Sequence, residues 1–250
     1  MKILSLNINN FAGRGVPKPS PKGFYTGFEF IREVRQWRGK PEHYVNADYV
    51  LSLISKESPD IVFLQEFDVT SSTSQRFIKN MIGLSYSVFY PDNNSEDSCK
   101  GHKSITIMFS KIPNIVVKSN SCLVSRSLKW VNVEVGDVLI AGVHFNYSMD
   151  YWNALEKFYS LNKGKKLLVI GDLNVCIPGT DRRARFDKLL SMGIVDIGMC
   201  DNTPTFVNGA RLDYVLTSES VKDRVSLKVD SSPIKEGFSD HSSLIVSYND

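Results

Sequence analysis

Short apolar runs recur along the chain, and most of them have the length and the alternation of β-strands. In residues 2–8 the alternation places Leu4, Leu6 and Ile8 on one face of a strand. The same pattern predicts strands at residues 61–64, 86–90, 104–109, 115–118, 128–135, 138–145, 167–170, 212–216, 225–229 and 243–248. Gly136-Asp137 is a hairpin turn signal that joins two of these strands.

Helical periodicity separates several of the strands. Residues 45–56 are typical of an amphipathic helix that stops at Ser58-Pro59. Further helices are predicted at residues 74–81, 151–161 and 186–192, and the polar residues 91–102 are predicted as a loop. Because strands occur both in adjacent pairs and separated by helices, the pattern favours two sheets packed face to face with helices outside, an α/β (α+β) fold, over one doubly wound sheet.

The composition indicates a sizeable hydrophobic core and a mild positive net charge. The chain has 250 residues, of which 42% are hydrophobic and 11% aromatic, and no internal repeat or low-complexity block. We therefore expect one domain over residues 1–250. The net charge of +3 does not by itself identify a nucleic-acid binder.

Positive charge is concentrated in a predicted insertion at residues 11–42, where seven Lys/Arg stand against three Glu and alternate with aromatic residues. Cations and aromatics together suit unpaired or distorted nucleic acid. An amphipathic covering segment with a solvated basic face explains the same pattern equally well.

Targeting and cysteine patterns suggest a cytoplasmic protein. The first residues become polar too soon for a signal peptide. No apolar run approaches the roughly 20 residues that cross a bilayer, so we expect no stable membrane insertion. Cys99, Cys122, Cys176 and Cys200 are scattered without a Cys-x-x-Cys, which argues against a disulfide framework or a structural zinc site. A monomer is expected.

Polar residues stand where the predicted strands end. Asp172 and Asn174 follow the apolar residues 167–170, and Asp240 and His241 precede residues 243–248. Holding such groups at the ends of buried strands is costly without a partner, so we expect them to converge on a metal ion, a phosphate, or both. The full set of candidate residues is Asn7, Glu66, His144, Asp172, Asn174, Asp213, Asp240 and His241.

Taken singly, these residues also have ordinary structural roles open to them. Asn7 could open a turn, and His144 could be a satisfied core histidine. Asp172 could form an Asx-turn, and Asp213 could make a salt bridge with Arg211.

Together the residues supply the parts of a phosphoester hydrolase. A hard cation such as Mg²⁺ prefers oxygen ligands, which Glu66 supplies with Asn7 or Asp240 beside it. Hydrolysis also needs an oriented water and donors to the phosphate oxygens, and it needs no Ser or Cys nucleophile.

The remaining residues match these needs. Asp172 could orient the water, while Asn174 and His144 could donate to non-bridging oxygens. His241 could contact the phosphate or accept a proton if Asp213 or Asp240 fixes its tautomer.

Five segments in this order resemble the endonuclease/exonuclease/phosphatase superfamily. They are Ser5-Leu6-Asn7, Ile61-Val62-Phe63-Leu64-Gln65-Glu66, Gly171-Asp172-Leu173-Asn174, Arg211-Leu212-Asp213-Tyr214 and Ser239-Asp240-His241. They extend from residue 5 to residue 241, and each lies beside a suitable strand, which makes the match specific. The resemblance implies a four-layer αββα sandwich, in which two packed mixed sheets are flanked by helices and the site lies where the sheets open.

The resemblance also implies roles for the residues. It implies Glu66 as the principal Mg²⁺ ligand, assisted by Asn7 and Asp240, with Mn²⁺ as a substitute. Asp172 would position or deprotonate the attacking water, and Asn174 would hold the phosphate. His241, paired with Asp213, would stabilise the developing charge or act as a base.

Features outside the five segments bear on the subfamily. His144 falls where the pancreatic-type deoxyribonucleases, sphingomyelinases and tyrosyl-DNA phosphodiesterases carry a catalytic His, whereas exonuclease III-type enzymes have a Tyr followed by Pro-Asn. The segment Gly171–Val175 is similar to the repair nucleases. Arg182, Arg183 and Arg185 would oppose the dipole of a helix that starts there, which favours phosphate contact.

The sequence therefore predicts a Mg²⁺-dependent phosphodiesterase, a nuclease acting on DNA. The alternative enzyme is a lipid or inositol-phosphate phosphatase or a sphingomyelinase-like phosphodiesterase, against which the lack of an apolar hairpin counts. The third hypothesis is a non-catalytic nucleic-acid-binding module, and the retention of every site residue counts against it.

Overall fold

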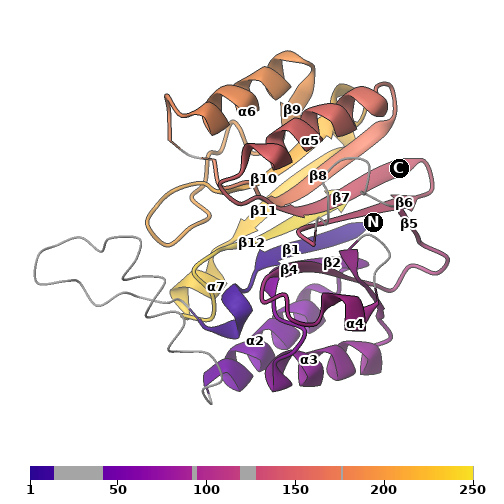
Figure 1. Ribbon diagram of the computed structural model, residues 1–250, viewed down its shortest axis with the longest axis vertical. Coiled ribbons are helices and arrows are strands. Elements are labelled where there is room, and N and C mark those ends of the chain that lie inside the picture. The colour runs from indigo at the N-terminus through magenta and orange to yellow at the C-terminus, as the bar shows by residue number, and fades with distance from the viewer. Residues whose placement is uncertain (14–41, 92–94, 119–127, 176, 250) are drawn as a thin grey trace, which may run out of the picture.

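The computed structural model describes residues 1–13, 42–91, 95–118, 128–175 and 177–249. Within these residues the strands form two six-stranded sheets that pack face to face, with the longer helices on their outer faces (Figure 1). This arrangement confirms the predicted four-layer sandwich. Nearly all of the predicted insertion at residues 11–42 lies outside the described residues.

The first sheet is built around the N-terminal strand. Its strand order is β11-β12-β1-β2-β4-β3. The strands are β1 (Lys2–Asn7), β2 (Ile61–Phe67), β3 (Ser87–Phe89), β4 (Ile105–Ser110), β11 (Val225–Asp230) and β12 (Ser243–Tyr248). β1 runs parallel to β2 and antiparallel to β12, so the sheet is mixed.

The second sheet is also mixed, with the strand order β5-β6-β7-β8-β10-β9. Its strands are β5 (Val116–Lys118), β6 (Trp130–Val135), β7 (Val138–His144), β8 (Lys166–Asp172), β9 (Ile194–Asp196) and β10 (Asp213–Ser218). β7 and β8 are parallel, and β6 pairs with β7 through the predicted Gly136-Asp137 hairpin.

Helices cover the outer face of each sheet. α2 (Glu42–Glu57) and α3 (Ser72–Gly83) lie on the first sheet, and α5 (Met149–Leu161) and α6 (Asp181–Ser191) lie on the second (Figure 1). The shorter helical turns are η1 (Asn9–Phe11), α4 (Glu96–Cys99), η3 (Glu219–Arg224) and α7 (Ser232–Lys235). No helix in these described ranges is long and apolar enough to cross a bilayer.

Alternation along the strands divides the apolar side chains among three cores. In β1, Leu4 and Leu6 pack with α2 and α3, whereas Ile3 packs between the two sheets. On the other side, Trp152 of α5 and Phe186 of α6 pack on the second sheet. Both faces of the central strands are therefore buried, with a few buried polar side chains within the strands, such as Ser5 and Asn132.

The structure differs from the sequence prediction in several elements, among them the short turns η1, η3 and α7, which were not predicted. α6 begins at Asp181, five residues before the predicted start, because Thr180 caps it by accepting a hydrogen bond from the Arg183 backbone N–H. The short α4 interrupts the predicted loop at residues 91–102, and β9 was not predicted.

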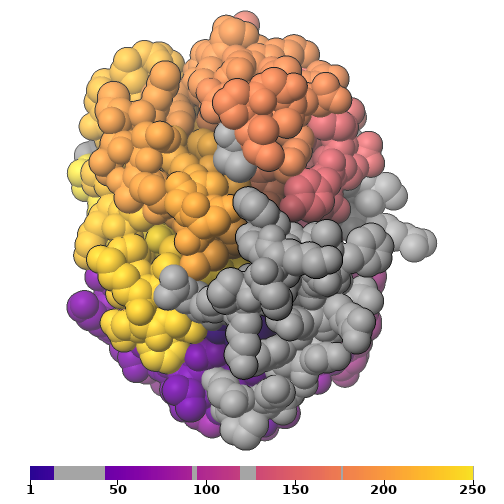
Figure 2. Space-filling model, turned by 90° about the vertical axis from the view of Figure 1, so that its left-hand side faces the viewer, coloured from indigo at the N-terminus to yellow at the C-terminus, as the bar shows by residue number. Residues whose placement is uncertain are grey.

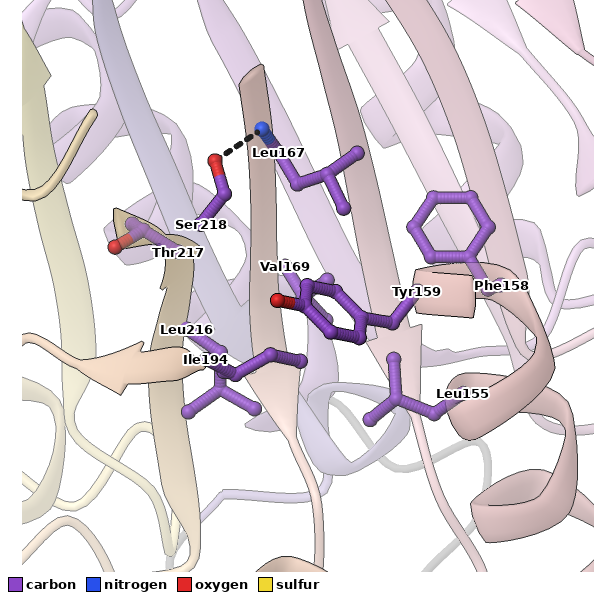
Figure 3. A pocket seen from close by; sticks show the side chains of 9 residues that line it. All are labelled: Leu155, Phe158, Tyr159, Leu167, Val169, Ile194, Leu216, Thr217 and Ser218. Carbon is purple, nitrogen blue, oxygen red and sulfur yellow. Dashed lines mark hydrogen bonds between the residues drawn. The ribbon is translucent and has the colours of Figure 1, made fainter. Parts of the chain in front are cut away.

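A small void lies between α5 and the second sheet (Figure 3). Its volume is about 10 Å³, and apolar side chains such as Leu155, Val169 and Leu216 line it. The Tyr159 hydroxyl at its wall already donates to the Met192 carbonyl at 2.9 Å. The void is too small and too apolar to hold a ligand, and we interpret it as a packing defect.

Gly142 in β7 is expected to be essential for the packing of the two sheets. A Cβ at this position would lie 2.0 Å from a ring atom of Phe63 in β2. Gly142→Ala should therefore lower the free energy of unfolding by about 2–3 kcal/mol. Gly83→Ala, at the end of α3 where a Cβ would meet nothing within 4 Å, is the matched control. Urea unfolding measures both, and equal midpoints for the two variants would contradict this packing.

Candidate active site

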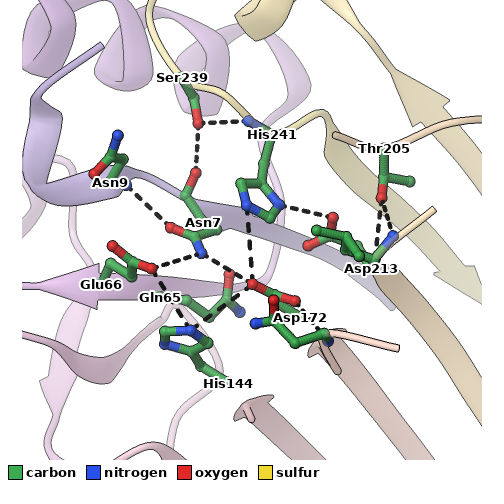
Figure 4. Close-up of polar contacts among 12 residues, drawn as sticks. Asn7, Asn9, Gln65, Glu66, His144, Asp172, Thr205, Asp213, Ser239 and His241 are labelled. Atoms are coloured by element: carbon green, nitrogen blue, oxygen red, sulfur yellow. Dashed lines mark hydrogen bonds and ion pairs between the residues drawn. The ribbon is translucent and has the colours of Figure 1, made fainter. Parts of the chain in front are cut away.

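The polar residues predicted from the strand ends lie together at one edge of the two sheets (Figure 4). In the first sheet Asn7 pairs with Gln65 where the parallel strands β1 and β2 end. In the second sheet His144 pairs with Asp172, and Asp172 pairs with Asp213 at the start of β10. The carboxyl ends of parallel strands meet at the same edge, so the topology itself gathers these side chains. Figure 2 views the molecule from this edge, with α6 in orange at the top.

The Asn7 side chain joins the two sheets. Its Nδ2 donates to Glu66 Oε1 at 3.3 Å and to Asp172 Oδ2 at 3.1 Å, while its Oδ1 accepts from the Asn9 backbone N–H at 3.0 Å. Asn7 therefore holds one carboxylate from each sheet within a few ångströms of a shared atom.

Glu66 is aimed into the site by an irregularity in β2. The register with β4 shifts between Leu64 and Phe67, and Glu66 has a φ of 55°, in the left-handed region. Its neighbour Gln65 is buried and donates to Ser5 Oγ at 2.9 Å. Bulges of this kind re-aim side chains at functional sites, and strained backbone persists there when the surroundings hold it.

His144 contacts both of these carboxylates. Its Nε2 lies 3.6 Å from Glu66 Oε1 and 3.8 Å from Asp172 Oδ2. Burial, and then the charges of Lys129 and His241, hold the pKa of His144 well below its usual value. His144 is therefore a buried histidine that is part of the polar cluster.

His241 is oriented by Asp213. Its Nδ1 lies 2.9 Å from Asp213 Oδ2, and its Nε2 lies 3.8 Å from Asp172 Oδ2. Burial alone would lower the pKa of His241, but the carboxylates around it, Asp213 foremost, hold that pKa well above the usual value. Of the two carboxylates that sequence reasoning left open for this role, Asp213 is the one that binds the ring.

Further hydrogen bonds fix this pair in place. Thr205 Oγ1 accepts from the Asp213 backbone N–H at 3.0 Å. Ser239 Oγ accepts from the His241 backbone N–H at 3.0 Å and donates to the Asn7 carbonyl at 2.6 Å. The predicted alternative of a salt bridge between Asp213 and Arg211 is wrong, because the Arg211 guanidinium pairs with Asp196 through contacts of 2.5 and 2.7 Å.

Asp172 and Asp240 are buried carboxylates whose pKa values are raised. Burial, opposed by the nearby His241, raises the pKa of each to about 7. Asp172 Oδ1 accepts the Asn174 backbone N–H at 2.9 Å, so the Asx-turn foreseen as its ordinary role is also present. Asp240 Oδ1 is buried with no hydrogen-bond partner among the described residues. Carboxylates concentrated in this way are stabilised by a cation.

The donor set fits a hard divalent cation. The carboxylates of Glu66 and Asp172 both accept from the Asn7 amide. Asp240 Oδ1 lacks a partner among the residues that the structure describes. Asp172, Asp213 and His241 also offer ligand atoms that lie within 4.8 Å of one another. Carboxylate oxygens are what Mg²⁺ prefers. Asn7 fits less directly, because its amide oxygen accepts from Asn9 and its nitrogen faces the carboxylates.

Asn174 lies beside Asp172 and links the site to α6. Its Nδ2 donates to the Phe145 carbonyl at 2.9 Å, and its own carbonyl accepts from the Arg182 guanidinium. That guanidinium also lies over the ring of Tyr147, 4.6 Å from the centroid. Tyr147 is 77% exposed, so a cation and an aromatic ring sit together at the rim of the site.

The other two arginines of the predicted phosphate contact are bound elsewhere. Arg183 Nε lies 2.9 Å from Asp187 Oδ1, and Arg185 Nη1 lies 2.9 Å from Glu156 Oε1 on α5. Of the three arginines, Arg182 is the one that contacts a predicted site residue.

Sequence reasoning missed Lys129, whose Nζ lies 3.1 Å from His144 Nδ1. A signal was present in the sequence, because the Gly136-Asp137 hairpin pairs Val135 with Val138, and counting back along both strands places Lys129 opposite His144. It also missed Asn9 and Thr205, and it gave no role to Ser239 of the Ser239-Asp240-His241 segment. All three support the site through hydrogen bonds to or from backbone groups.

Comparisons with known proteins identify the family and the fold of the chain. The model of the Endonuclease/Exonuclease/phosphatase family matches residues 4–241. No curated protein sequence matches the chain.

Three solved structures share the fold. An AP endonuclease from Archaeoglobus fulgidus has 18% identity and a TM-score of 0.66, with 100% of each chain covered. A 3′ phosphatase, NExo, from Neisseria, bound to product DNA hairpin, has 14% identity and a TM-score of 0.65, with 100% of this chain and 99% of that chain covered. The endonuclease domain of TRAS1, a telomere-specific non-LTR retrotransposon, has 14% identity and a TM-score of 0.62, with 99% and 97% covered.

Proposed function

Because the chain belongs to the endonuclease/exonuclease/phosphatase family and is therefore an enzyme that hydrolyses phosphoester bonds, we propose that it is a divalent-cation-dependent phosphodiesterase that cleaves DNA. The observation that carries the proposal is the position of Asp172, whose Oδ2 lies within 4 Å of the Nε2 atoms of both His144 and His241 and of the Asn7 amide. Since the site draws on segments from residue 7 to residue 241, we also propose that residues 1–250 form one catalytic domain.

We assign the reaction to these residues as follows. Asp172 orients the attacking water and takes its proton, for which a pKa of about 7 is well matched near neutral pH. His144 and Asn174 donate to the non-bridging oxygens of the phosphate. His241, charged and held by Asp213, stabilises the negative charge that develops in the transition state.

Glu66, with Asp240 and Asn7, would hold the cation, Mg²⁺ or Mn²⁺. When bound there, a divalent cation supplies Lewis-acid stabilisation of phosphoryl oxygens. The orphaned Asp240 Oδ1 and the bulge that aims Glu66 inward support this assignment.

Arg182 and Tyr147 support nucleic acid as the substrate. A guanidinium stacked on an exposed aromatic ring can contact a backbone phosphate while the ring stacks on an unpaired base. The 3′ phosphatase of similar fold is described as bound to a DNA hairpin, which is consistent with this substrate class.

A substrate panel tests the proposal. The purified chain, with Mg²⁺, would be given single- and double-stranded DNA, RNA, DNA with 5′-tyrosyl or 3′-phosphate ends, sphingomyelin and inositol phosphates. We expect turnover of DNA, weakening steeply with salt as counterions are released. Turnover of sphingomyelin or inositol phosphates without turnover of DNA would contradict a DNA substrate.

Arg182→Ala should weaken DNA binding across sequences. Removal of one phosphate contact should reduce the slope of log affinity against log salt by about 1. Arg224→Ala, an exposed arginine on η3, is the matched control and should leave the slope unchanged. Fluorescence anisotropy with labelled DNA over a range of salt concentrations measures both slopes, and identical slopes would exclude Arg182 from phosphate contact.

A further inference from the structure

We propose that Lys129 is a positioning residue that fixes the tautomer of His144 with its proton on Nε2, so that His144 serves as a hydrogen-bond donor to the substrate and not as a base. The donor role rests on the proposed function, whereas the tautomer itself does not. The inference arises from the contacts on the side of His144 that faces away from the carboxylates.

Lys129 contributes a half-buried ammonium group on the Nδ1 side of the His144 ring. Its Nζ lies 3.1 Å from His144 Nδ1 and 3.2 Å from Ser104 Oγ. An ammonium group has donors and no acceptor, so His144 Nδ1 must accept and the neutral ring must carry its hydrogen on Nε2. That nitrogen faces Glu66 Oε1 at 3.6 Å and Asp172 Oδ2 at 3.8 Å, both of which are acceptors.

Strand pairing fixes Lys129 in this place. β6 begins at Trp130, which pairs with Val143, and the His144 backbone N–H donates to the Lys129 carbonyl at 2.8 Å. Burial lowers the pKa of Lys129, while the carboxylates Glu66 and Asp172 oppose that shift and favour the ammonium form. The cation is thus held by the backbone register and by the charge of the site.

The two histidines of the site are oriented by groups of opposite charge. Asp213 accepts from His241 Nδ1, the usual arrangement, which leaves Nε2 able to exchange a proton. Lys129 donates to His144 Nδ1, so His144 Nε2 keeps its hydrogen and has no free lone pair with which to accept a proton. His144 can then offer an N–H to a phosphate oxygen but can neither accept a proton at Nε2 nor bind a cation there.

Nuclear magnetic resonance of the full-length, ¹⁵N-labelled chain tests the tautomer directly. The chain has four histidines, and His144→Gln identifies the His144 signals by their loss. Long-range proton–nitrogen correlation of the wild-type chain, with and without Mg²⁺, should show His144 protonated on Nε2 alone. Lys129→Met should change that pattern and Lys129→Arg should preserve it. A wild-type His144 protonated on Nδ1, or a pattern unchanged in Lys129→Met, would overturn the inference.

Kinetics distinguish a positioning role from a structural one. Lys129→Met should lower kcat for DNA by about 10- to 100-fold, the usual effect of losing a group that orients a histidine, with KM changed by less than about twofold. Lys129→Arg should recover part of the loss. Lys165→Met, an exposed lysine near the opposite end of β8, is the control and should leave kcat unchanged. Equal kcat values for Lys129→Met and Lys165→Met would overturn the inference.

Failure of the inference can be separated from failure of the proposed function. DNA hydrolysis by a wild-type chain whose His144 is protonated on Nδ1 would overturn the role of Lys129 alone. The expected tautomer in a chain that hydrolyses no DNA would overturn the proposed function and leave the tautomer assignment in place.

Discussion

Asp172→Asn is expected to reduce kcat for DNA hydrolysis by about 10³- to 10⁴-fold, because it removes the group proposed to take the proton of the attacking water. Asparagine has nearly the same shape, but its single carbonyl oxygen can accept from only one of the two donors, the Asn7 amide and the Asn174 backbone N–H, which bind different Asp172 oxygens at 3.1 and 2.9 Å. KM should change little, since the loss falls on the transition state. Steady-state kinetics with a short DNA substrate measure the effect, and a loss of less than tenfold would exclude Asp172 as the base.

The same substitution loses one hydrogen bond at Asp172, but it should gain stability relative to wild type as the pH rises. The pKa of Asp172 is raised to about 7 by burial, above the value of an unfolded aspartate. A raised carboxyl pKa contributes stability that is complete below the unfolded pKa of about 4 and is lost as the pH rises through the folded pKa. Asp172→Asn does not titrate, so its stability relative to wild type should increase between about pH 4 and pH 8.

Urea unfolding in the presence of EDTA, at the two ends of that pH range, measures this difference without interference from a bound cation. The expected pair of results, lower activity with a stability that rises relative to wild type towards the higher pH, is typical of a residue that is kept for function at a cost to the fold. A difference in stability that is the same at the two pH values would contradict the raised pKa of Asp172.

The parts of the site that sequence could predict are those fixed by strand ends. Asp172 and His144 end adjacent parallel strands, and once the strands are placed in order their register brings the two residues to the same edge. Asp213 follows from the same logic, since it begins the antiparallel strand beside Asp172. The alternation of apolar residues therefore predicts most of the strands, and the short polar motifs predict most of the residues that lie in the site.

What the sequence could not provide depends on contacts between distant residues. Arg185 was expected to contact phosphate because its charge opposes the helix dipole, but Glu156, on a different helix, neutralises it. Arg211 could not be assigned to Asp196 over Asp213 without the packing of β9 beside β10. The bulge that turns Glu66 into the site could not be predicted, because two polar residues after the apolar run 61–64 do not distinguish a bulge from the end of the strand.

Removal of divalent cations is expected to abolish hydrolysis, and Mg²⁺ or Mn²⁺ should restore it. We expect this because the carboxylates of Glu66 and Asp172 lie next to one another. Both accept from the same Asn7 amide nitrogen, Glu66 at 3.3 Å and Asp172 at 3.1 Å. Two carboxylates so close repel one another, and a cation that both can approach relieves the repulsion. Full activity after dialysis against EDTA would contradict the proposed chemistry.

Glu66→Gln should raise the Mg²⁺ concentration needed for half-maximal activity by at least about tenfold, because a hard cation binds an amide oxygen more weakly than a carboxylate. A cation that binds the folded chain also raises its melting temperature, so Mg²⁺ should stabilise the wild type and have less effect on Glu66→Gln. Glu219→Gln, an exposed residue of η3, is the control that keeps the wild-type response. The thermal shift does not depend on any substrate, so a lost Mg²⁺ response in Glu66→Gln, with the control unaffected, would locate the cation at Glu66 even if DNA proved to be the wrong substrate.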